Sequence, residues 1–248
     1  MKRLLKQLVK EEVSGYLLGE QFSHANQKDI IKAINKQFPK ITQKLGLAGA
    51  RFVGEGYYGK AYKTSSGNIV KITSDLSEAE VSAKLIGKKL KYVANIEAVY
   101  KLPKLQIPRY NPWDKNDIRK EEIQVYAIIQ ERLYKLGSGD EELIDMIYPA
   151  FQENPTPRNI KREIAAARGE LEITDKQAKR AGELVSAMVE LAKFKIKLQD
   201  LHTGNVMQSE DGQLKIIDLR GAPGKSPKLK ALRAEEIEPE NQMKKEEY

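Results

Sequence analysis

The sequence predicts an α+β fold in which a β-rich part precedes a mainly helical part. Between residues 51 and 130, short runs rich in β-branched and aromatic residues recur, and turn residues such as Ser65–Ser66–Gly67 separate them. After Leu133 the apolar residues recur at helical spacing, most clearly over Asp175–Ile196. A chain of 248 residues is long enough to bury the core of two closely packed lobes.

The β-rich part begins with three strand-like runs, which are Arg51–Val53, Ala61–Thr64 and Asn68–Ile72. A helix is expected next over Asp75–Leu90, because alanine, isoleucine and leucine recur along one face. Two more strands are expected, at Ile96–Leu102 and Gln124–Gln130. The stretch 103–121 between them holds several prolines and many charges, and it is expected to be an inserted loop.

The later part is expected to contain three helices, Glu141–Tyr148, Arg158–Gly169 and Asp175–Ile196, followed by a hairpin of Val206–Met207 and Leu214–Asp218. Four segments result. They are a helical N-terminal extension (1–47), a β-rich lobe (48–133), a mainly helical lobe (134–224) and a charged tail (225–248).

The composition narrows the classes of function. The chain lacks cysteine, which excludes a disulfide scaffold and fits a cytoplasmic protein. No apolar run approaches the roughly 20 residues that cross a bilayer, so neither a membrane span nor a signal peptide is expected. Lysine and arginine number 43 against 35 acidic residues, a net charge of +8. This excess permits nucleic-acid binding, but few aromatics accompany the basic runs, so solvated faces and attraction for phosphates are favoured.

A glycine-rich segment follows the first strand. Gly54, Gly56 and Gly59 fit the pattern G-x-G-x-x-G, and a loop without side chains lets backbone N–H groups approach phosphates closely. The same pattern occurs in dinucleotide-binding folds and in ordinary flexible turns. Here a strand and a hairpin follow the glycines, and no acidic residue lies on a second strand at the dinucleotide-binding spacing.

Lys71 is the single charged residue of the apolar run Ile69–Ile72. An ammonium on this strand would lie beneath the glycine-rich loop and could hold phosphates, although a lysine on an exposed strand face is also common. A carboxylate on the next helix would be needed to position it. Glu78 and Glu80 are the candidates, and Glu78 is preferred because it lines up with the apolar face of the helix.

The most specific segment is Asp200-Leu-His-Thr-Gly-Asn205, followed by a hairpin that returns the chain to Asp218. Taken with the glycine loop and Lys71, it resembles the protein-kinase-like superfamily. The loop is similar to D-x-x-x-x-N, in a variant like the DLHPGN form of aminoglycoside phosphotransferases, with Thr203 in place of proline. His202 and His24 are the only histidines, which excludes a His-rich metal site. The resemblance gives His202 a supporting role.

The resemblance implies a two-lobed kinase-like fold that binds ATP and Mg²⁺ between the lobes. Asp200 would orient the attacking hydroxyl, while Asn205 and Asp218 would ligate the metal. Lys71, paired with a glutamate, would hold the α- and β-phosphates. The adenine edge would meet the backbone of Glu131 and Leu133, with Gln130 at the entrance, although a plain buried strand predicts the same apolar run.

The chain departs from ordinary protein kinases in three places. Leu198–Gln199 replaces the His-Arg of HRD, DLRG replaces DFG, and no A-P-E follows Gly221. These differences imply a shortened helical lobe and an atypical kinase. A protein serine or threonine hydroxyl, autophosphorylation included, is the favoured acceptor. A small-molecule alcohol and a pseudokinase scaffold remain alternatives.

Overall fold

The computed structural model describes residues 28–36, 38–39, 41–43, 45, 47, 49–56, 58–110, 118–153, 156–169, 173–196 and 201–219. These residues form an antiparallel sheet, separate hairpins and several helices, so the predicted α+β class is confirmed. The predictions for residues 1–27 and for the tail 225–248 lie outside this set. The segment boundaries at 47, 133 and 224 stay predictions. No helix in the described part of the chain is both long and apolar enough to span a membrane.

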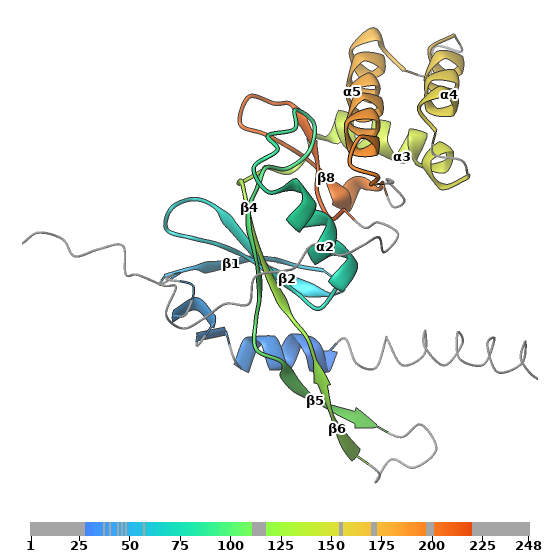
Figure 1. Ribbon diagram of the computed structural model, residues 1–248. Helices are drawn as coiled ribbons and strands as arrows, with labels where there is room; N and C mark the ends of the chain where they lie inside the picture. Colours follow the sequence, from blue (N-terminus) through green and yellow to red (C-terminus); the bar gives the residue numbers. More distant parts are fainter. Residues whose placement is uncertain are drawn as a thin grey trace, which may run out of the picture.

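The β-rich half is a five-stranded antiparallel sheet in the order β1-β2-β3-β7-β4 (Figure 1). Its strands are β1 (Arg51–Glu55), β2 (Gly59–Lys63), β3 (Ile69–Thr73), β4 (Ile96–Lys101) and β7 (Tyr126–Gln130). The turn at 64–67 joins β2 to β3, and Gly67 takes a positive φ of 94° there. The five strand predictions are therefore confirmed to within a few residues.

Helices cover both faces of this sheet (Figure 1). Helix α2 (Leu76–Leu85) packs on one face, where its Val81 and Leu85 join a core with Ile128 of β7. Residues 28–36 are helical and lie on the opposite face, where Ile34 is fully buried. Helix α2 ends five residues earlier than the predicted Asp75–Leu90, because the chain turns at Gly87, whose φ is 70°.

The stretch 103–121 is not a plain loop, so that expectation is wrong. Its ends form a two-stranded hairpin, β5 (Leu105–Tyr110) and β6 (Ile118–Ile123), which projects from the sheet in Figure 1. Leu105 belongs to the core cluster that includes Val70 and Ile72 of the sheet, and Ile107 is also buried, while Lys120 and Glu122 are exposed. Proline fits at position 108 because a two-stranded hairpin leaves one side of each strand without a ladder partner.

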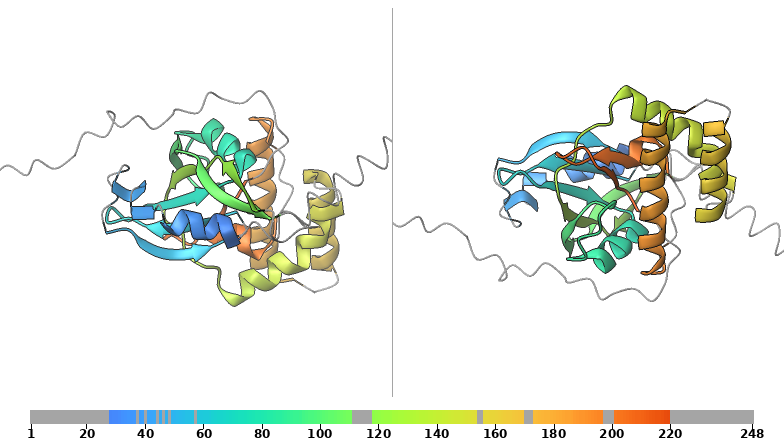
Figure 2. Two further views of the ribbon diagram at one scale, coloured as in Figure 1. Left: turned by 90° about the horizontal axis from the view of Figure 1, so that it is seen from below. Right: turned by 90° about the horizontal axis from the view of Figure 1, so that it is seen from above.

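The second half is mainly helical and lies to one side of the sheet (Figure 2). It holds α3 (Ser138–Glu153), α4 (Pro157–Gly169) and α5 (Asp175–Ala192), then the turn η1 (Thr203–Asn205) and the hairpin β8 (Val206–Gln208) and β9 (Leu214–Ile216). Helix α3 is longer than predicted and contains Pro149. The two halves correspond to the two-lobed arrangement that the resemblance implies.

Candidate active site

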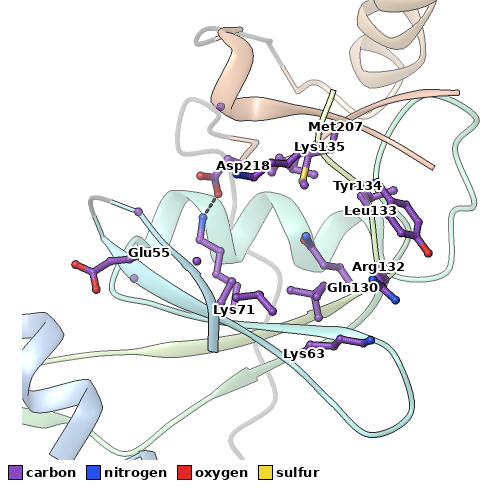
Figure 3. A pocket seen from close by; sticks show the side chains of 18 residues that line it. Glu55, Lys63, Lys71, Gln130, Arg132, Leu133, Tyr134, Lys135, Met207 and Asp218 are labelled. Atoms are coloured by element: carbon purple, nitrogen blue, oxygen red, sulfur yellow. Dashed lines mark hydrogen bonds and ion pairs between the residues drawn. The ribbon is translucent and has the colours of Figure 1, made fainter. Parts of the chain in front are cut away.

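A cavity of about 470 Å³ lies between the sheet and the β8–β9 hairpin, a volume in the range of small-ligand sites. Its walls come from β1, β2 and β3, from the connection after β7, and from residues around β8 and β9. Figure 3 shows labelled side chains from both halves of the molecule converging on it. Of the predicted site residues, those lining it are Gly54, Gly56, Gly59, Lys71, Leu133 and Asp218.

Lys71 is the centre of the charged end of this cavity. Its Nζ lies 2.7 Å from a carboxylate oxygen of Glu78 and also donates to Oδ1 of Asp218 (Figure 3). The side chains of Lys71 and Glu78 are only 16% and 7% exposed. Water screens such a pair poorly, so the ammonium is held in place by two carboxylates from different parts of the chain.

Local sequence explains how Lys71 and Glu78 meet. Along β3, Val70 and Ile72 point into the core on one face, so Lys71 points to the other face. Asp75 caps α2 by accepting a hydrogen bond from the Glu78 N–H at 3.1 Å. This cap fixes the first turn of the helix and aims Glu78 at the sheet. Glu78, and not the alternative Glu80, makes the ion pair with Lys71.

The β8–β9 hairpin delivers Asp218. Val206 pairs with Ile216 across the hairpin, and the Ile217 N–H donates to the Asn205 carbonyl at 2.9 Å. The backbones of Asn205 and Asp218 are therefore neighbours. Asp218 has a φ of 56°, a left-handed conformation that non-glycine residues seldom adopt and that clusters at functional sites.

The glycine-rich loop is held by its own backbone and by the end of β3. The Gly56 N–H donates to the Gly59 carbonyl at 2.9 Å, and the Ser74 N–H donates to the Tyr58 carbonyl at 3.0 Å. A Cβ at Gly59 would lie 2.0 Å from the carbonyl oxygen of Ile72, so no other residue fits there. A Cβ at Gly54 or Gly56 would meet no atom within 4 Å, so close packing does not explain those two glycines.

Residues after β7 form the other end of the cavity. Leu133 lines it, and its N–H donates to no other residue in the described part of the chain. Glu131 is not a lining residue. Its N–H donates to the Asn95 carbonyl at 3.0 Å, and its carboxylate pairs with Lys215 at 3.1 Å. Because the Glu131 N–H is already paired, the prediction that the Glu131 backbone meets adenine now applies to its carbonyl alone.

Several lining residues are not among the predicted site residues. Apolar side chains line the roof and floor, namely Val53, Ala61, Ile69, Met207 and Ile217. Three cations also line the cavity, Lys63, Arg132 and Lys135. None of the three makes an ion pair within the described residues, whereas Lys71 makes two. Strand alternation could have placed Lys63 on the Ala61 face, but Arg132 and Lys135 lie in a connection that lacks a periodic pattern.

The predicted catalytic loop is described only in part. Asp200 lies outside the described residues, as do Arg220 and Gly221. His202 is described, and its Nδ1 accepts a hydrogen bond from the Gly204 N–H at 3.0 Å, which fits its predicted supporting role. Gly204 itself lines the cavity, and Asn205 behind it is buried at 6% exposure.

The oxygen donors near the cavity fit a magnesium ion shared with a nucleotide. Asp218 lines the cavity with a carboxylate, and the buried Asn205, whose backbone neighbours that of Asp218, carries an amide oxygen. Mg²⁺ accepts both kinds of ligand. Within the described residues, no group of three or more histidine and acidic side chains could hold a metal on its own. In general, Mg²⁺ binds proteins through one or two carboxylates and takes its remaining ligands from phosphates and water.

Solved structures that are similar to this chain include three nucleotide-bound proteins. They are Rad53 (1–466) with AMP-PNP, the streptomycin–ATP–APH(2″)-IIa ternary complex, and ADP-bound aminoglycoside phosphotransferase APH(2″)-Ib. Their identities to this chain are 14%, 10% and 12%, with TM-scores of 0.36, 0.27 and 0.29. The matches cover 74%, 75% and 75% of this chain.

The same matches cover 42% of the Rad53 chain and 71% of each phosphotransferase chain, so this chain spans less than half of Rad53. No family model and no curated protein matches the sequence. These TM-scores are low, and the chemistry of the cavity is defined by the side chains of this chain.

Proposed function

We propose that this protein is an atypical kinase that transfers the γ-phosphoryl group of a nucleoside triphosphate, ATP first, to a hydroxyl group. The supporting observation is the contact of Lys71 with both Glu78 and Asp218, which come from separate elements of the fold. The contact brings an ammonium and two carboxylates to one end of a cavity roofed by a glycine-rich loop.

Each residue has a distinct proposed role. The purine lies between Ala61 and Ile69 above and Met207 below, with the Leu133 N–H at its edge. Lys71 holds the α- and β-phosphates, and Glu78 keeps the ammonium beneath the loop. Asn205 and Asp218 hold Mg²⁺, which when bound neutralises charge on the phosphates. Asp200 accepts the proton of the attacking hydroxyl.

The contact between Lys71 and Asp218 also fits this proposal. A triphosphate would place its own oxygens beside the Lys71 ammonium and so compete with Asp218, whose carboxylate then faces the metal. Catalysis of this kind consists mainly of positioning and charge neutralisation.

For the acceptor we favour a protein serine or threonine, autophosphorylation included. Among the described residues that line the cavity, four cations outnumber the two acids, Glu55 and Asp218, so the lining lacks the acidic pocket that a polycationic acceptor such as an aminoglycoside would need. A small-molecule alcohol without such charge is the second candidate. The third is a pseudokinase scaffold, which the altered HRD and DFG triplets favour and the retained charged residues oppose.

The test incubates the full chain with γ-labelled ATP and Mg²⁺, alone, with cell extract and with a panel of small alcohols. The expected result is label on a serine or threonine, and Asp218→Asn should reduce transfer by about a thousandfold or more. Asp211→Asn is the matched control, since Asp211 is exposed on the turn between β8 and β9. Nucleotide binding without transfer to any acceptor would instead identify a pseudokinase.

A further inference from the structure

A surface of exposed lysines lies where the loop after α2 meets the end of α5. Its members, which make no ion pair within the described part of the chain, are Lys88, Lys89, Lys91, Lys193 and Lys195. Nζ of Lys88 lies 5.7 Å from the centre of the Phe194 ring, so two segments that are far apart in the sequence are neighbours here. None of the five lysines lines the cavity between the two halves. We call these five residues the lysine surface.

Two aromatic rings lie among these lysines. Tyr92 follows the loop, and Phe194 comes from the end of α5; both are half-buried and pack against the apolar core. Nζ of Lys91 lies 4.9 Å from the centre of the Tyr92 ring, within the range of a cation–π contact. The fold thus adds a ring from a separate element to a basic run that has few aromatics in the sequence. Partly exposed rings among cations are the combination that binds bases along a phosphate backbone.

The backbone provides a second, independent observation. Among the described residues, the non-glycine residues with a positive φ are Asp218 in the cavity, Lys89 (45°) and Lys195 (58°). Lys195 follows α5, where the Ile196 N–H donates to the Leu191 carbonyl at 3.1 Å, and glycine is the usual residue at such a helix end. A side chain in this conformation costs free energy, and such residues cluster at functional sites. Lysine at both positions therefore indicates a role for its charge.

The acidic residues near the lysine surface leave it positively charged. The pKa of Lys91 is raised, first by its hydrogen bond with Tyr92 and to a smaller extent by the charges of Glu183 and Glu190. Glu183 also lies 3.5 Å from Nη1 of Arg180, which balances part of its charge. Five lysines thus face two carboxylates of α5, one of them already paired. Such an excess attracts a polyanion.

We propose that the lysine surface binds single-stranded nucleic acid, with the lysines at the phosphates and the rings of Tyr92 and Phe194 against bases. A single strand is favoured because the bases of a duplex stack on one another and leave no free face for a ring. An anionic membrane would need several projecting apolar side chains. Among the described residues of these two segments, Ile86 is the only large apolar side chain that is exposed.

The first experiment measures binding of the full chain to a fluorescein-labelled single-stranded RNA of about 20 nucleotides by anisotropy, at 50 and 200 mM salt. The affinity of the wild type should fall by about fiftyfold over this range, since about four neutralised phosphates give a logarithmic slope of about −3. No detectable binding at 50 mM salt, or an affinity that salt leaves unchanged, would overturn the proposal. ATP binding in the cavity is measured separately and is independent of either result.

The second experiment combines Lys89→Gly with Lys195→Gly. This double variant removes two charges and relieves two left-handed backbone conformations, so RNA binding should weaken by about tenfold while the midpoint of thermal unfolding stays equal or rises. Lys32→Gln with Lys176→Gln removes two exposed lysines elsewhere and should change RNA binding by less than about threefold. An equal loss in the two double variants would overturn this location of the binding site.

The third experiment tests the chemistry of the partner with Phe194→Leu. This variant should weaken RNA binding by about fivefold or more and leave binding of heparin, a polyanion without bases, unchanged. Equal effects on RNA and heparin, or binding of phosphatidylserine vesicles in place of RNA by the wild type, would overturn nucleic acid as the partner.

Discussion

At the scale of single residues, the Lys71–Glu78 pair joins the site to the stability of the fold. The side chain of Glu78 is almost fully buried. Glu78 lies in the first turn of α2, where the Asp75 cap accepts a hydrogen bond from its N–H. Removing the lysine would leave an uncompensated charge in a poorly hydrated position, which is far more costly than losing an exposed ion pair. Loss of the Lys71–Glu78 pair should therefore lower the free energy of unfolding as well as the activity.

We predict that Lys71→Met lowers the free energy of unfolding by about 3 kcal/mol, because Glu78 loses its buried counter-charge. Adding Glu78→Gln in the same chain should recover at least half of that loss. Urea denaturation of the single and double variants measures both effects. Additive losses in the double variant would show that the two side chains are not coupled.

Tyr62 gives a second prediction at this scale. Burial, with a smaller effect from the charge of Glu55, raises the pKa of Tyr62 from 10.0 to about 12. The neutral phenol is thus favoured in the folded protein. Its contribution to stability is complete below about pH 10 and is lost as the pH rises through about 12.

Tyr62→Phe should remove this dependence. The free energy of unfolding of the wild type, taken relative to the variant, should fall between about pH 10 and pH 12. Comparing the two proteins at each pH cancels the titration of the lysines. Parallel curves over this range would mean that the Tyr62 hydroxyl is not protected by the fold.

At the scale of elements, the sequence predicted the five strands of the sheet and the ion pair but missed the β5–β6 hairpin. The strands and Lys71 were predictable because alternation and glycine spacing are local signals. Pro103, Pro108 and a run of charges concealed the hairpin, since they are typical of loops. Contacts of Leu105 with the core of the sheet, and burial of Ile107, outweighed those local preferences.

The contact between β2 and β3 gives the prediction at this scale. A methyl group at Gly59 would collide with the Ile72 carbonyl, so Gly59→Ala should lower the free energy of unfolding by about 2–4 kcal/mol. Gly54→Ala is the matched variant, because its Cβ would meet no atom within 4 Å. It should change that free energy by less than about 1 kcal/mol. Both are measured without nucleotide, and equal losses would contradict the geometry.

At the scale of the whole molecule, one apolar core joins the two halves and fixes the cavity between them. This core extends from α2 and β7 through α3 and α5 to the β8–β9 hairpin. Polar contacts add to it, among them the ion pair of Glu131 with Lys215 and the paired backbones of Tyr134 and Gln208. Lys71 and Asp218 thus face one another across a continuous packed structure.

The order of motifs along the chain was enough to predict that these parts converge. It could not predict the cations around the opposite end of the cavity, because Lys63 lies on β2 while Arg132 and Lys135 follow β7, and no local pattern links these two segments. Nor could it show that the Asn95 carbonyl takes the Glu131 N–H, a contact between residues distant in sequence. The order of the motifs thus indicated the kind of chemistry, and contacts between residues distant in sequence determined the shape of the cavity.

The most direct test of the central claim measures how Mg²⁺ changes the affinity for ATP in the wild type and in Asp218→Asn. If Lys71 and Asp218 hold one triphosphate together, Mg²⁺ should tighten ATP binding to the wild type by about tenfold or more. In Asp218→Asn the effect of Mg²⁺ should largely disappear, while Asp211→Asn should behave as the wild type. An equal Mg²⁺ effect in Asp218→Asn, or no ATP binding in the wild type, would contradict the claim.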